Sequence, residues 1–463
     1  MGEIVAASIL ALVLLFVPGA VAALLAGVRG LSAIALAPAM TYVGTGFGAQ
    51  VARWIGAPWG WLEAVISWAG LALAAWAVGR VSRLHTPRSL TRWNPFQWLM
   101  VGLSALAAWI LGAGLTAGQG MPTFDPSGRR GAWHDVLALA SSLVPVRAAE
   151  VGMVATGMGA VWVCSVISLQ RVLFPARPSL AIVGAIGSVA YQAVPAAMPT
   201  LGRFSEGAAL ALVPALLAWS IQLARVATLR STGRLVRLGI LFVAFQGVWL
   251  VHPLGAVAFV LFAVPAAVPM VRRLARQFRA EPVRWTALTC FAASVAIGAV
   301  VSVSAIPVTD HLVRLNPGDF QGTPLALLGA VADWTPYFRW WPNLLVAGFV
   351  VAGLIVALGS RRRRTWLAAA YALAFTWYGA AALINVGGLP PWFADPGSLA
   401  VLMSIPGIPL GSIAVSAGLK SFRAAHWSQT SRLRIAAAGA GTLAATLTLV
   451  ARWIGILTGH LDP

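Results

Sequence analysis

Cysteine and charged residues are scarce in this sequence. Its two cysteines, Cys164 and Cys290, both lie inside apolar runs and lack the spacing of a metal or redox motif. The phosphate-binding patterns GxGxxG and GxxxxGK(S/T) do not occur in a cytoplasmic context. These absences exclude a cysteine-based centre and give no support to nucleotide hydrolysis on an inner face. We assign no metal site and no cofactor, and leave open whether a divalent metal ion is needed.

Apolar residues dominate the composition. Hydrophobic residues make up 59% of the chain and charged residues 10%. Only helices and closed barrels satisfy their own backbone inside a bilayer, and the apolar runs have the length of helices. The sequence therefore predicts an all-α polytopic membrane protein.

We count fourteen apolar runs of about 20 residues, each long enough to cross ~30 Å of hydrocarbon. They lie near residues 4–26, 31–52, 60–79, 96–117, 150–170, 178–199, 207–224, 235–251, 254–271, 285–305, 341–359, 365–387, 398–419 and 435–457. The longest stretches between them, 118–149 and 306–340, are shorter than a typical independent domain. We expect one transmembrane domain over 1–463, with about 14 transmembrane helices and two sizeable outer loops.

Basic and acidic residues concentrate in different sets of alternate loops. Of the 32 basic residues, 24 fall in one set of alternate loops, whereas 11 of the 12 acidic residues lie on the other side. Cytoplasmic loops hold an excess of lysine and arginine, so we expect a multi-pass protein of a bacterial plasma membrane with both termini extracytoplasmic. The net charge of +20 then serves contact with anionic membrane lipids, and we expect no nucleic-acid partner.

The first outer loop carries candidate chemistry. From Trp133 onward, apolar residues recur at helical spacing against His134 and Asp135, which predicts an interfacial helix. Asp125 stands just before a turn. External carboxylates suit glycosyl transfer from a lipid-phosphate sugar, because a carboxylate can take the proton of an acceptor hydroxyl while cations stabilise the leaving phosphate.

Few basic residues share the acidic side. Arg129, Arg130, Arg147 and Arg203 are the candidates that could supply positive charge to a phosphate, against the alternative that they are ordinary solvated loop charges. His252 and Pro253 interrupt a long apolar segment, which predicts two helices that meet in a tight outer turn with the histidine at its tip.

Three stretches of the sequence, taken in order, span nearly the whole chain. They read VPGAVAALLAGVRGLSAIALAPAMT followed by WIGAPWGWLE, then HPLGAVAFVLFAVP, then PPWFADPGSLAVLMSIPGIPLGSIAVSAG. Together they resemble an actinobacterial family of alanine- and leucine-rich integral membrane proteins of unassigned function. That family is in turn similar to the GT-C membrane glycosyltransferases. These enzymes take sugars from polyprenyl-phosphate donors on the outer face, and arabinosyltransferases are the familiar case in actinobacterial envelopes.

The resemblance implies a catalytic aspartate in the first large outer loop, with an aromatic residue before it and a histidine four residues after it. Phe124 and Asp125 match the first two positions and His134 matches the third. However, nine residues separate Asp125 from His134, and Arg130 stands four residues before the histidine. Either a short insertion has moved the acid or the catalytic carboxylate has been lost.

Two further motifs of that superfamily are altered. Its His-Pro-Asn appears as His252, Pro253 and Leu254, without the asparagine. Its Trp-aromatic-x-Asp-Pro-x-Arg includes Trp392 and Asp395 but ends without the arginine. Both changes remove hydrogen-bonding or charged groups that an anionic donor would use.

The resemblance implies a GT-C-like glycosyltransferase that moves a sugar from a polyprenyl-phosphate donor to a cell-envelope glycan or glycolipid. The catalytic candidates are Asp125, Asp135 and His134, and the substrate-binding candidates are Arg129, Arg130, Arg203, His252, Trp392 and Asp395. Two alternatives stay open. One is a catalytically silent paralogue that acts as a partner subunit of an envelope enzyme, and the other is a lipid flippase, for which charge inside the spans is expected.

Overall fold

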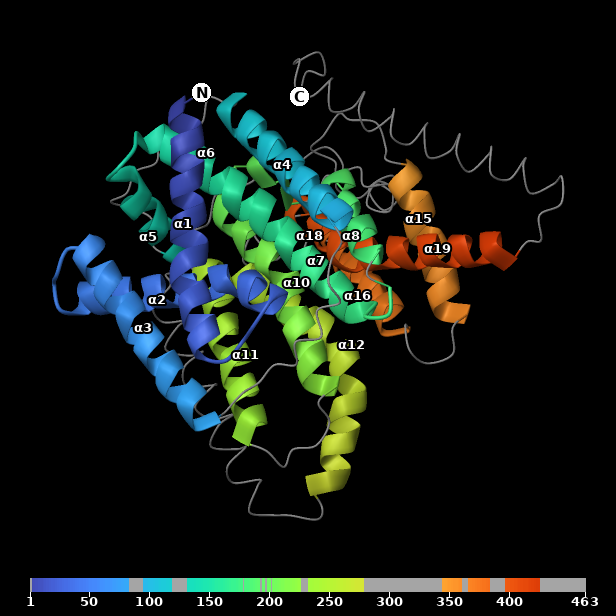
Figure 1. Ribbon diagram of the computed structural model, residues 1–463. Helices are drawn as coiled ribbons and strands as arrows, with labels where there is room; N and C mark the ends of the chain where they lie inside the picture. Colours follow the sequence, from blue (N-terminus) through green and yellow to red (C-terminus); the bar gives the residue numbers. More distant parts are fainter. Residues whose placement is uncertain are drawn as a thin grey trace. The chain divides into compact units, whose positions relative to one another are not determined.

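The computed structural model describes residues 2–82, 95–118, 131–177, 179–191, 194–195, 198–200, 202–225, 232–278, 344–359, 365–383 and 396–424 (Figure 1). All regular secondary structure in these ranges is helical, and they contain no strand. The predicted all-α class is therefore confirmed for the described part of the chain.

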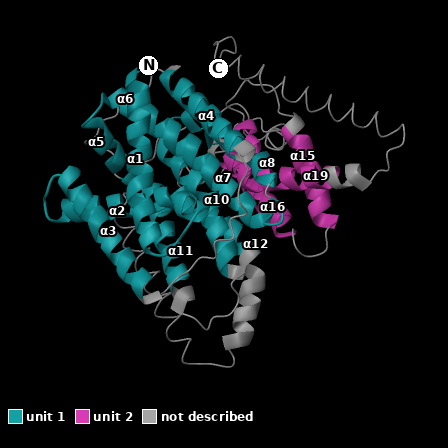
Figure 2. Cartoon of the chain, in the orientation of Figure 1, with its two compact units in different colours: residues 1–185, 194–314, 390–392 teal, residues 186–193, 315–389, 393–463 magenta. Residues whose placement is uncertain are grey.

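The chain divides into two compact units (Figure 2). The described helices of unit 1 are α1 (Gly2–Leu25), α2 (Leu31–Trp54), α3 (Trp61–Ser82), α4 (Pro95–Gly118), α5 (Ala132–Ser141), α6 (Val146–Val154), the π-helix η1 (Ala155–Ala160), α7 (Val161–Leu173), α9 (Met198–Thr200), α10 (Phe204–Arg225), α11 (Thr232–Val251) and α12 (Pro253–Phe278). Those of unit 2 are α15 (Leu344–Gly359), α16 (Thr365–Leu383), α18 (Pro396–Leu402) and α19 (Ser404–Ala424). Helix α8 (Leu180–Ala190) begins in unit 1 and ends in unit 2. The single transmembrane domain over 1–463 stays a prediction.

Seven helices among the described residues are long and apolar enough to cross a membrane. They are Gly2–Leu25, Leu31–Trp54, Trp61–Arg80, Trp98–Ala117, Val146–Leu173, Phe204–Leu223 and Leu399–Gly418. Four shorter apolar helices accompany them, at Leu180–Ala190, Val236–Val251, Pro253–Pro265 and Val346–Gly359. These helices support a multi-pass membrane protein. The predicted runs 285–305 and 435–457 and the whole of the predicted outer loop 306–340 lie outside the described residues, so the total of about fourteen spans stays a prediction.

The run expected at 178–199 is only partly one helix. Helix α8 covers 11 residues, which is about 16 Å of helix and roughly half of the hydrocarbon thickness. Two short helical pieces follow it, a π-helical turn at 194–195 and α9 at Met198–Thr200. The apolar run is therefore divided into several short helical pieces.

A side-chain hydroxyl of α2 forms hydrogen bonds with backbone groups of α1. Pro18 lies inside α1 and disturbs the helix there, because it has no N–H and its ring crowds the preceding turn. The Thr41 hydroxyl accepts a hydrogen bond from the Gly19 N–H at 2.9 Å and donates one to the Leu15 carbonyl at 2.8 Å. A side chain at Gly19 would collide with the Ala37 carbonyl, so only glycine allows this close approach.

Several helix ends of unit 1 gather at one place. Gly79, near the end of α3, lies against the Leu25 carbonyl at the end of α1. The Gln222 side chain near the end of α10 donates to Ser32 at the start of α2, at 3.2 Å. Trp219 of α10 donates to the Arg237 carbonyl near the start of α11, at 3.0 Å.

These contacts place the ends of α1, α3 and α10 beside the starts of α2 and α11. Helix α2 therefore runs opposite to α1 and α3, and α11 runs opposite to α10. Which of the two ends of unit 1 faces the cytoplasm stays a prediction from the arginine distribution.

Replacing Thr41 with valine tests the link between α1 and α2. The variant Thr41→Val keeps the shape of the side chain but leaves the Gly19 N–H and the Leu15 carbonyl without their partner. We expect the free energy of unfolding to fall by about 1–3 kcal/mol, measured as a lower unfolding midpoint in detergent. Thr376→Val is the matched control, because the exposed Thr376 hydroxyl donates to the Ala372 carbonyl of its own helix. Equal losses in both variants would contradict the bridging role of Thr41.

Candidate functional site

Helix α5 presents Asp135 in its first turn. Gly131 precedes the helix with a φ of 137°, a backbone conformation that favours glycine. The Asp135 N–H donates to the Gly131 carbonyl at 3.0 Å and so begins the helical ladder. Trp133 is buried and packs against η1, where a side chain at Gly157 would collide with its ring. The start of the helix is thereby fixed, and its dipole favours a carboxylate there.

The helix predicted after Trp133 is confirmed, but its polar side is not open to solvent. Asp135 is 7% exposed, and Val136 and Leu137 beside it are buried as well. His134 is only partly exposed. Helix α5 packs against α2, α6, α1 and α11, and Figure 1 shows α6 near the amino-terminal end of α1 with α5 beside it. The expectation of a His-Asp pair on a surface helix is therefore corrected for Asp135.

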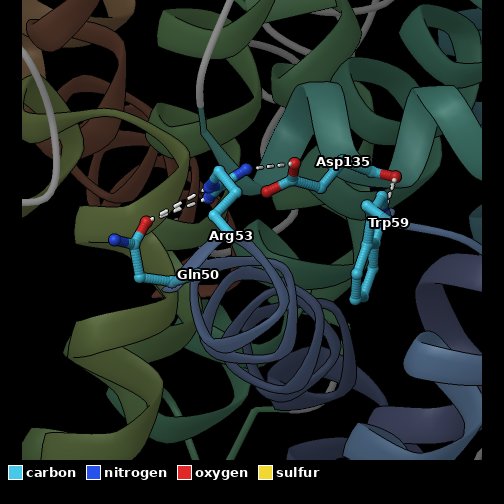
Figure 3. Close-up of polar contacts among 4 residues, drawn as sticks. All are labelled: Gln50, Arg53, Trp59 and Asp135. Carbon is cyan, nitrogen blue, oxygen red and sulfur yellow. Dashed lines mark hydrogen bonds and ion pairs between the residues drawn. The ribbon is translucent and has the colours of Figure 1, made fainter. Parts of the chain in front are cut away.

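Asp135 forms an ion pair with Arg53 at the end of α2 (Figure 3). Arg53 Nη1 lies 3.1 Å from Asp135 Oδ1. Gln50 holds the same guanidinium from the other side, because its Oε1 accepts hydrogen bonds from Arg53 Nε at 3.3 Å and Nη2 at 3.1 Å. Trp59, just before α3, donates from Nε1 to the Asp135 carbonyl at 3.0 Å. These contacts tie α5 to the end of α2 and the approach to α3.

The environment of Asp135 shifts its proton affinity. Burial raises the pKa of the carboxyl group to about 6, although the nearby Arg53 acts to lower it. The second carboxylate oxygen, Oδ2, is buried and has no hydrogen-bond partner among the described residues. Desolvation therefore outweighs the ion pair, and Asp135 can gain or lose a proton near neutral pH.

A second polar cluster joins α10 to the corner between α11 and α12. Arg203 precedes α10, and its Nη1 lies 3.3 Å from Oε2 of Glu206 in the first turn of that helix. The other oxygen of Glu206 lies 3.8 Å from Nε2 of His252, which is an ion pair when the imidazole is protonated. The buried His252 also accepts a hydrogen bond from the Leu254 N–H through Nδ1, at 3.2 Å. In neutral His252 this bond places the proton on Nε2, which faces the carboxylate.

The two clusters lie at the same end of unit 1. A Cβ added at Gly131 would lie 3.4 Å from the Leu250 carbonyl and 3.9 Å from the Val251 carbonyl, at the end of α11. This Cβ position at Gly131 also lies 3.9 Å from Nδ1 of His134. Because His252 follows Val251 directly, the start of α5 and the turn that carries His252 are neighbours.

The structure thus brings together four of the residues singled out in the sequence: His134, Asp135, Arg203 and His252. The other candidates lie outside the described residues: Asp125, Arg129, Arg130, Trp392 and Asp395. Arg147 lies at the start of α6 and donates to the Ala117 carbonyl at 3.2 Å, so part of its hydrogen-bonding capacity is used within the fold. Within the described ranges, no three His, Cys, Asp or Glu side chains gather as a metal-ion site.

Three members of these clusters were not singled out as site residues from the sequence. Glu206 follows Arg203 by three positions, a spacing that places the two on one helical face, so this pair could have been found. Arg53 was visible only as one of the few basic residues on the acidic side. Trp59 gave no signal, because tryptophan near a span boundary usually marks the membrane interface.

The pKa of Asp135 predicts a pH-dependent stability. The pKa rises from 3.8 to about 6 on burial, so the folded chain binds this proton more tightly than the unfolded chain does. The resulting stability is complete below about pH 4 and is lost as the pH rises through about 6. We expect a loss on the order of 3 kcal/mol across this window.

The test compares the unfolding midpoint of the wild type with that of Asp135→Asn from acid to neutral pH. The asparagine variant lacks the titrating group, so its midpoint depends less on pH, whereas the exposed-site control Glu3→Gln keeps the wild-type dependence. Parallel curves for the wild type and Asp135→Asn would show that this carboxyl does not titrate as described.

Glu206→Gln tests the second cluster. Removing the carboxylate leaves Arg203 and His252 without their shared anion, and we expect about 1–3 kcal/mol less stability. The unfolding midpoint of the variant in detergent, again against Glu3→Gln, measures the effect. A midpoint equal to that of the control would mean that the cluster does not stabilise the α11–α12 corner.

The comparisons with known proteins point to one family. No curated protein and no solved structure matches the chain. A family model, described as a family of unknown function (DUF6541), matches residues 12–127 and 130–459, which is nearly the whole chain. The chain therefore belongs to the family DUF6541.

Proposed function

We propose that this protein is a GT-C-like membrane glycosyltransferase. It would move a sugar from a polyprenyl-phosphate donor to a cell-envelope glycan or glycolipid on the outer face of a bacterial plasma membrane. One observation carries the proposal. Residues expected in the site from three distant segments, His134 with Asp135, Arg203, and His252, lie near one another at one end of unit 1.

The chemistry needs a proton acceptor and a stabilised leaving group. The acceptor hydroxyl oxygen attacks the anomeric carbon, and the bond between that carbon and the donor phosphate oxygen breaks. The hydroxyl proton passes to a carboxylate, and the polyprenyl phosphate leaves with the bonding electron pair. A carboxylate and arginine side chains at the same end of the unit are the groups that this reaction requires.

Within the proposal the two aspartates have different roles. Asp135 is buried and already engaged by Arg53, so it is poorly placed to meet an acceptor hydroxyl. We therefore assign the base role to Asp125, on the resemblance of its loop alone. Asp135 and His134 would shape the site, and Arg129, Arg130 and Arg203 would face the donor phosphate. Trp392 and Asp395 are assigned to substrate binding on the resemblance alone.

Separate replacement of the two aspartates tests the function. We expect Asp125→Asn to lower sugar transfer from a polyprenyl-phosphate donor by about 10²–10⁴-fold, since a general base contributes that much. Asp135→Asn should lower the rate far less, and Glu3→Gln serves as the control. Wild-type rates in Asp125→Asn and Asp135→Asn would remove the base assignment, and absence of transfer by the wild type under all donors tried would contradict the enzyme itself.

A catalytically silent partner subunit is the second candidate. It is favoured by the charge balance of the described clusters, because Arg53 faces Asp135 and Arg203 faces Glu206. A phosphate-binding enzyme needs positive charge that its own carboxylates do not cancel. Co-purification of a stoichiometric membrane partner, with turnover only in the complex, would favour this function over the first.

A further inference from the structure

The Arg53–Asp135 pair joins an accessible cation to an enclosed anion. The Arg53 side chain is 33% exposed, whereas that of Asp135 is 9% exposed. Only one oxygen of the carboxylate is engaged, because Oδ2 is buried without a hydrogen-bond partner among the described residues. Arginine and carboxylate can form two parallel hydrogen bonds, so this single contact leaves the pair weaker than it could be.

Gln50 keeps the guanidinium in place independently of Asp135. Its Oε1 accepts from both Nε and Nη2 of Arg53, and all three residues appear together in Figure 3. Gln50 is uncharged, so it orients Arg53 without neutralising it. If Asp135 became neutral, the arginine would keep its position and present a full positive charge.

Among the described residues, Arg53 is the charged side chain that acts most directly on Asp135. Burial raises the pKa of Asp135, and Arg53 acts to lower it. The other described charged or titratable groups on α5 and on the elements that pack with it are not among the causes of this shift: Glu3 of α1, Tyr42 of α2, Arg147 and Glu150 of α6, Glu206 of α10, Arg237 of α11 and His134 of α5 itself. Once Arg53 has another partner, burial alone acts on the carboxyl and favours its neutral form.

We propose that Arg53 binds the phosphate of an anionic lipid-linked substrate and that Asp135 releases it by taking up one proton. In this exchange, the Asp135 carboxylate takes one proton from a hydronium ion, which becomes water, and one anion replaces that carboxylate at Arg53. The transfer of this proton is the only covalent change. The identification of the anion as the donor phosphate rests on the proposed function, whereas the exchange itself rests on the pair.

Binding is measured with the full chain in detergent, by calorimetry between pH 5 and pH 8. The probes are a short-chain prenyl phosphodiester and inorganic sulfate, because neither changes its charge in this range. We expect the wild type to bind the phosphodiester more tightly as the pH falls, by up to tenfold per pH unit, as uptake of a single proton allows.

Variants separate the two members of the pair. Asp135→Asn should bind the phosphodiester equally well at all pH values, and at least tenfold more tightly than the wild type at pH 8. Arg53→Gln should lose at least tenfold at pH 5, while Arg53→Lys should lose less. Arg80→Gln, at an exposed position near the opposite end of α3, is the matched control and should bind as the wild type does.

Several outcomes would overturn the exchange. These are a wild-type affinity that does not change with pH, an Arg53→Gln variant that binds like Arg80→Gln, or an Asp135→Asn variant that keeps the wild-type pH dependence. Tighter binding of sulfate than of the phosphodiester would show a site for free anions and contradict the lipid-linked substrate. Turnover is not measured, so intact pH-dependent binding without sugar transfer would count against the proposed function alone.

Discussion

Burial of one carboxylate is the constraint from which the described site follows. A buried ion needs a partner of opposite charge, because removal from water costs several kcal/mol. For Asp135 that partner is Arg53, 82 positions earlier in the chain. The pair, together with the hydrogen bond from Trp59, fixes α5 against the end of α2 and the start of α3. The position of α5 then determines which residues its first turn presents to the α11–α12 corner.

The interior of unit 1 leaves little room for charge elsewhere. Helices approach closely through small residues, as where Gly152 lies against Ala7 and Gly159 lies against Ala108. Such packing favours association of helices in a membrane but cannot hold long polar side chains. Buried polar groups in these spans are mostly serine and threonine, which bond to backbone carbonyls. The ion pairs of the described residues are accordingly found near helix ends, where the proposed chemistry is placed.

Sequence patterns predicted the helices of this protein better than the partners of its polar residues. Runs of apolar residues located α1 to α4 within a few positions, because length and composition determine which segments enter a bilayer. The same signal could not show the π-helix at Ala155–Ala160 within one continuous span, since no proline or charged residue marks it. The burial of Asp135 was also hidden, because it arises from contacts with α2 and the segment before α3 rather than from its own helix. The Arg203–Glu206 ion pair, by contrast, could have been predicted, because the two residues are only three positions apart in the sequence.

The described site depends on an energetic coupling between Arg53 and Asp135, and a double-mutant cycle measures this coupling most directly. Unfolding free energies are compared for the wild type, Arg53→Met, Asp135→Asn and the double variant at neutral pH. If the two side chains act as a pair, the double variant loses at least about 1 kcal/mol less than the two single losses combined. Losses that add to within about 0.5 kcal/mol would show that the two residues act independently and would contradict the site described here.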